Sequence, residues 1–71
     1  MDKNLARELL PVVTDPDIMG VLSLYVFDRI NKLHLQLESV EEYREVQRIQ
    51  GQIKEIKRLL TLKEEVMANA K

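Results

Sequence analysis

The most constraining feature of this 71-residue chain is an apolar heptad repeat near its end. Large apolar side chains recur there every seven residues, and two more fall three residues after the first two. The set consists of Val46, Ile49, Ile53, Ile56, Leu60 and Met67. Lys63 takes the place where a third intermediate apolar residue would stand. A repeat of this kind is typical of the seam of a coiled coil or of an antiparallel helical hairpin.

The middle of the chain carries a second apolar stripe at helical spacing. Its members are Met19, Leu22, Val26, Ile30, Leu33 and Leu37. Thr14 or Asp15 can cap a helix here, and Pro16 suits a first helical position, so we expect a helix from about 16 to about 37. Residues 21–27 and 33–37 also have strand-like composition or alternation, but two strands alone are unstable in water. The paired stripes therefore favour an antiparallel helical hairpin.

The remaining boundaries follow from local signals. Leu5 and Leu9 lie at helical spacing before Pro11, which predicts a short helix from about 3 to about 10. Ser39 followed by Glu42 matches a capping box, which predicts a second long helix from about 40 to about 68. We expect one all-α domain over residues 1–71.

The size of the chain points to association. A chain this short buries only about 60% of its unfolded surface, and such chains usually need a disulfide, a metal or a partner. The sequence has no cysteine and a single histidine. We therefore expect a homo-oligomer, a bundle or coiled-coil-like assembly, with another protein as the alternative partner.

A further set of residues falls outside the two facing stripes and predicts an oligomer or partner face. It comprises Ile18, Val21, Leu24, Tyr25, Phe27, Leu35, Gly51, Leu59, Leu62 and Val66. A second apolar face on a hairpin implies another contact, either between copies or with the short N-terminal helix folded back over part of it. Gly51 is included because glycine inside a helix costs stability, which hints at a close approach by another helix.

No pattern in the sequence identifies a reaction. His34 lies among leucines with no recognisable partner, and Asp15, Asp17 and Asp28 lack the spacing of a calcium or di-iron site. Phosphate-binding loops, nucleophile elbows and zinc signatures are absent. We expect no enzyme activity, no cofactor, no metal and no small-molecule substrate.

Nucleic acid and membranes are disfavoured as partners. The last helix carries a local basic set, namely Arg44, Arg48, Lys54, Lys57 and Arg58. Acidic residues share that region, the net charge is -1, and only three aromatic residues occur in the chain. The apolar stretch 18–27 is too short to span a bilayer, and no signal segment is evident, so we expect a cytoplasmic protein.

The segment YREVQRIQGQI over residues 43–53, continuing through 59–62, resembles segments of small uncharacterised helical proteins of tailed bacteriophages. The resemblance implies a small helical protein of virion assembly or structure, and it transfers no site residue. We expect a structural or interaction module that self-associates through its apolar stripes. The alternatives are an oligomeric nucleic-acid-binding regulator and a chaperone or inhibitor that clasps a partner helix.

Overall fold

The chain folds into helices throughout. The computed structural model describes residues 1–71 and contains α1 (Lys3–Val13), α2 (Pro16–Ser39), α3 (Tyr43–Lys57), the 3-10 helix η1 (Arg58–Thr61) and α4 (Leu62–Asn69). No residue forms a strand. The predicted all-helical fold is therefore confirmed, and the alternative of two strands is wrong.

Helix α2 begins at the strongest start signal in the sequence. The Asp15 carboxylate accepts hydrogen bonds from the backbone N–H groups of Asp17 (2.9 Å) and Ile18 (3.2 Å). Thr14, the other candidate cap, donates its hydroxyl to the Leu10 carbonyl and closes α1 instead. Two adjacent polar residues thus end one helix and start the next, and the two helices meet at a bend of 98°.

Helix α1 continues three residues past its expected end, so the prediction that Pro11 stops it is wrong. Proline lacks the N–H that would bond one turn back, and this normally disfavours helix interiors. Here the extra turn carries Val13, which is 1% exposed and packs with Ala6 and Val66. Burial of that side chain offsets the missing hydrogen bond.

The expected capping box at Ser39 is not formed. Ser39 is the last residue of α2, and its hydroxyl donates to the Gln36 carbonyl (3.0 Å). Glu42 precedes α3 as its N-cap and makes no side-chain capping bond. Helix α3 therefore begins at Tyr43, three residues later than predicted.

The expected continuous helix over 40–68 is interrupted by η1. A 3-10 segment has three residues per turn instead of 3.6, so four such residues rotate the following side chains by roughly 80°. That rotation brings Val66 into full burial and leaves Met67 47% exposed. Arg58 forms ion pairs with Glu55 (3.2 Å) and Glu65 (3.7 Å), one on each side of the break.

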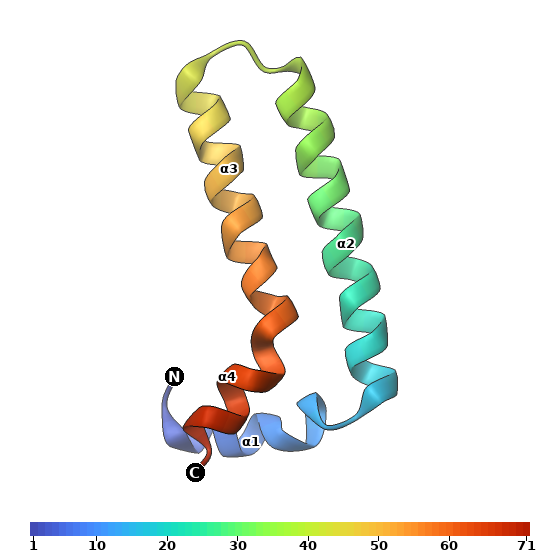
Figure 1. Cartoon of the computed structure of the whole chain (residues 1–71), viewed down its shortest axis with the longest axis vertical. Helices are drawn as coiled ribbons and strands as arrows, with labels where there is room; N and C mark the ends of the chain where they lie inside the picture. Colours follow the sequence, from blue (N-terminus) through green and yellow to red (C-terminus); the bar gives the residue numbers. More distant parts are fainter.

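Two separate apolar cores result. The first lies between α2 and α3 and contains Val26, Ile30, Leu33, Ile49 and Ile53. The second lies where α1 contacts α4 and contains Ala6, Val13 and Val66. Figure 1 shows α2 and α3 side by side with opposite directions, and α1 and α4 together at the end where both termini lie.

The molecule is thin. Its principal extents are 45 × 24 × 13 Å, and the shortest is close to the diameter of one helix, about 10–12 Å. Figure 1, viewed along the shortest axis, shows α2 and α3 side by side, whereas α4 crosses over α1 at the end where both termini lie. No single helix has both the length and the apolar character needed to cross a membrane; α1 and α2 meet those criteria only as a bent pair.

Candidate interaction surface

Most residues of the two predicted facing stripes lie in or against the first core, but Met19 and Met67 do not. Besides the five residues of the first core, Leu22, Leu37, Ile56 and Leu60 are half-buried and pack against it. Val46 is also half-buried. Met19 packs against the second core instead, near α1. Met67 is exposed, so its assignment to the helix–helix seam is wrong. The cause is the 3-10 segment η1, which rotates the side chains that follow it.

Part of the predicted partner face is covered within the chain. Val66 is fully buried in the second core, and Leu62 packs beside it. Leu59 is half-buried against the first core. The interpretation of Leu62 and Val66 as a free face is therefore wrong, because the N-terminal helix folds over α4.

The α2 members of that face remain uncovered. Their exposed fractions lie between 47% and 72%, and they are Ile18, Val21, Leu24, Tyr25, Phe27 and Leu35. All six belong to the one long helix α2, whose buried side faces α3. A group of large exposed apolar side chains on one helix usually marks an interaction site.

Three of these residues form a continuous ridge. Ile18, Val21 and Tyr25 are spaced three and four residues apart, and Arg29 follows after four more, so all of them lie on one side of α2. We call Ile18, Val21 and Tyr25 the α2 ridge. Phe27 lies two residues from Tyr25, a rotation of roughly 200°, and so projects from the other side of the helix.

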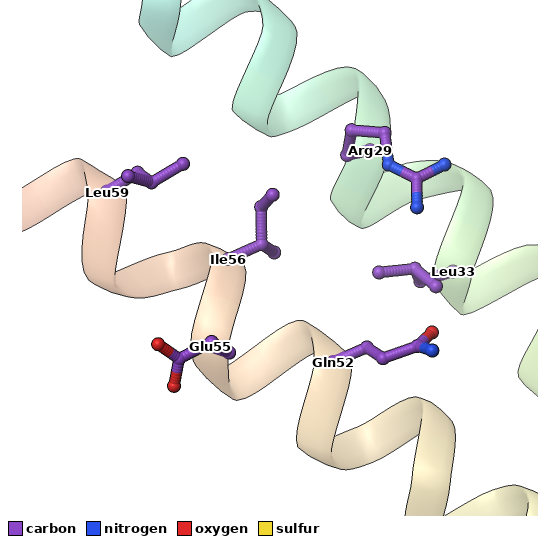
Figure 2. A pocket seen from close by; sticks show the side chains of 6 residues that line it. All are labelled: Arg29, Leu33, Gln52, Glu55, Ile56 and Leu59. Carbon is purple, nitrogen blue, oxygen red and sulfur yellow. The ribbon is translucent and has the colours of Figure 1, made fainter.

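A groove of about 430 Å³ begins where the ridge ends. It lies between α2 and the helices that follow the turn, and its lining residues are Arg29, Leu33, Gln52, Glu55, Ile56 and Leu59. Figure 2 shows Leu33 extending from α2 toward α3, with Ile56 and Leu59 on the facing wall. The groove therefore has apolar side chains along it and polar groups at its rim.

Arg29 distinguishes the groove from ordinary surface. It is half-buried, yet it forms none of the ion pairs in the chain. Glu55, on the opposite wall, is already paired with Arg58. The guanidinium of Arg29 is thus free to contact a group that enters the groove. The apolar patterns in the sequence do not single out Arg29, although its one-turn spacing from Tyr25 is a usable signal.

Carboxylates pair with two members of the basic set on α3 and η1, which consists of Arg44, Arg48, Lys54, Lys57 and Arg58. Arg48 binds Glu45 at 2.7 Å, and Arg58 binds Glu55 and Glu65. The hydrogen bonds from Arg48, together with its charge, lower the pKa of Glu45 below its ordinary value. This basic surface is therefore partly neutralised within the chain.

Asp15, Asp28 and His34 do not come together in one site. Asp15 caps α2, Asp28 pairs with Lys32 at 2.9 Å, and His34 is exposed. No three histidine, cysteine, aspartate or glutamate side chains gather into a group that could hold a metal ion. Gly51 has only open space where a side chain would project.

Comparison with protein-family models, with curated proteins and with solved structures finds no match to this chain.

Proposed function

We propose that this protein is a non-enzymatic structural or protein–protein interaction module. In this proposal α2 and α3 form a helical hairpin, and copies of the chain associate through the apolar surface of α2. The observation that carries the proposal is the amount of surface that the single chain leaves exposed.

That surface is larger than a self-contained protein of this mass would have. The accessible area is 5450 Å² for 8.3 kDa. The scaling law for folded monomers gives about 4,600 Å² at this mass, so the excess is roughly 900 Å². A standard protein–protein interface buries about 800 Å² on each partner, which matches the excess.

The open arrangement of α2 and α3 supports the same proposal. Stable domains pack two or more layers of secondary structure around a core, whereas α3 contacts only α2 and η1, so no further element covers the pair formed by α2 and α3. Its radius of gyration is 14.9 Å, against about 11 Å for a compact chain of this length. Only eight residues are buried. A second copy would supply the missing layer.

We further propose a role in virion structure or assembly, and its support is the resemblance of residues 43–62 to small phage proteins. Nucleic-acid binding has less support, because intrachain carboxylates already pair with Arg48 and Arg58. Capture of a different protein by the α2 surface would leave the isolated chain monomeric, so it makes the opposite prediction about mass.

Light scattering across a hundredfold range of concentration, with helicity followed by circular dichroism, tests the proposal. We expect a highly helical species of at least twice the 8.3 kDa chain mass. The apolar contact should make that mass insensitive to salt, because salt screens charge interactions between exposed groups. A mass of 8.3 kDa at every concentration would contradict self-association.

A further inference from the structure

We propose that two copies pair as an isologous dimer in which the α2 ridge of each copy fills the groove of the other. The inference rests on the proposed function, since it names the surface and the geometry of the association. Its occupant is a second copy of this chain.

Self-complementarity is the first argument. A two-fold contact requires that one surface carry both a projecting part and the hollow that receives it. Here the ridge and the groove follow one another along the same side of α2, with Arg29 at the boundary. A two-fold axis lying in the plane of that face, midway between them, exchanges the two. Each ridge then meets the other copy's groove, and both contacts form at once.

The chemistry of the two parts also matches. The ridge offers Val21 and Tyr25, which are 68% and 55% exposed. The groove offers the half-buried Ile56 and Leu59, which Figure 2 shows on one wall, and it is also lined by Leu33, which is only 3% exposed. Burying a tyrosine ring among aliphatic side chains removes a large apolar area from water.

Arg29 gains a partner in this arrangement. The exchange of ridge and groove brings the Tyr25 ring of one copy beside the Arg29 guanidinium of the other. A guanidinium over an aromatic face is attracted to it, and the attraction increases when water is excluded. Arg29 is half-buried and has no ion pair within its own chain. In the dimer each Arg29 contacts the Tyr25 ring of the other copy, so two such contacts form.

Area and charge are consistent with a stable dimer. The surface excess of roughly 900 Å² per chain is what a standard interface would remove from each partner. Each copy carries a net charge of only -1, so long-range repulsion between copies is small. Asp28 and Lys32, beside Arg29 on α2, are already paired with each other and so add no net charge to that of Arg29.

A matched pair of variants tests the proposal. Tyr25 and Phe27 are equally exposed, at 55%, and lie on opposite sides of α2, so only Tyr25 belongs to the ridge. We expect Tyr25→Asp to raise the dimer dissociation constant, measured by sedimentation equilibrium, by about 30-fold or more, as for a central interface residue. We expect Phe27→Asp to change it by less than about 3-fold, as for a residue outside an interface.

Two further variants test the chemistry of the contact. Tyr25→Phe keeps the ring and should dimerise like the unmodified chain. Arg29→Ala should weaken the dimer by about 3-fold or more by removing the cation from the ring. Circular dichroism checks that each variant stays helical, which we expect because the changed side chains contribute nothing to either core.

The outcomes separate this inference from the proposed function. An unmodified chain that is monomeric would overturn both. A dimeric chain in which Tyr25→Asp and Phe27→Asp have equal effects would overturn the ridge-and-groove contact alone, and self-association would stand. A dimer weakened by Phe27→Asp and not by Tyr25→Asp would assign the interface to the other side of α2.

Discussion

Gly51 lies in the interior of α3, a helix of 15 residues, with no positive backbone φ angle. Apart from its chain neighbours and its own helix backbone, no heavy atom lies within 4 Å of the position a Cβ would take. The position therefore imposes the entropic cost of glycine without any steric need for it. Replacing it by alanine should stabilise the protein.

The expected gain follows from helix propensity alone. Alanine is favoured over glycine by about 1 kcal/mol in a helix interior, and the added methyl group meets no neighbour here. For a chain of this size, 1 kcal/mol corresponds to a rise in melting temperature of about 4–8 °C. Gly20→Ala is the matched control, because Gly20 lies in α2 with equally open surroundings. The two gains should add.

Thermal unfolding followed by circular dichroism measures the effect. All variants must be compared at one protein concentration, because association makes the melting temperature concentration-dependent. We expect Gly51→Ala to raise the melting temperature and to leave the assembly mass unchanged. The sequence-based hypothesis that Gly51 lies at a partner contact predicts a changed mass instead. A fall in melting temperature, with Gly20→Ala still stabilising, would refute the reasoning from open space.

Three further predictions follow from other parts of the chain. Ile49→Ala, which empties a 1%-exposed core position, should cost about 2–5 kcal/mol in the free energy of unfolding by urea. Pro11→Ala restores a backbone donor inside α1 and should slow amide hydrogen exchange there, by up to about 3 kcal/mol in opening free energy. Arg48→Gln should raise the pKa of Glu45, followed by NMR titration, because Arg48 holds it down. Since the folded-state pKa of Glu45 is lowered, this pair favours folding above about pH 4.3, and the contribution is lost as the pH falls through the folded-state pKa.

Much of the first core could be predicted from the sequence. The spacing of Val26, Ile30 and Leu33 defines one side of a helix whatever lies opposite, and Asp15 with the following proline defines where that helix begins. The interruption at η1 could not be predicted in the same way. A heptad repeat assumes a constant rotation per residue, and the repeat ending at Met67 continues through the break unaltered. Only the contact of α4 with α1 makes Val66 the better residue to bury.

Of the candidate interaction surface, the α2 ridge could be predicted from the sequence and the groove could not. Ile18, Val21 and Tyr25 could be identified because they do not fit the stripe that faces α3. The groove could not, because its walls come from residues more than twenty positions apart, such as Arg29 and Gln52. Their neighbourhood depends on the register between α2 and α3, which the position of the turn sets. That turn ends at Glu42 and not at the predicted cap.

The most direct test of ridge-and-groove pairing is an isotope-filtered NMR experiment on a mixture of labelled and unlabelled chains. Such a sample reports contacts between copies and excludes those within one chain. Ridge-and-groove pairing predicts intermolecular cross-peaks from the Tyr25 ring protons to the methyl groups of Ile56 and Leu59. Intermolecular cross-peaks from Phe27 in their place, or none from Tyr25 in a sample of dimeric mass, would contradict it.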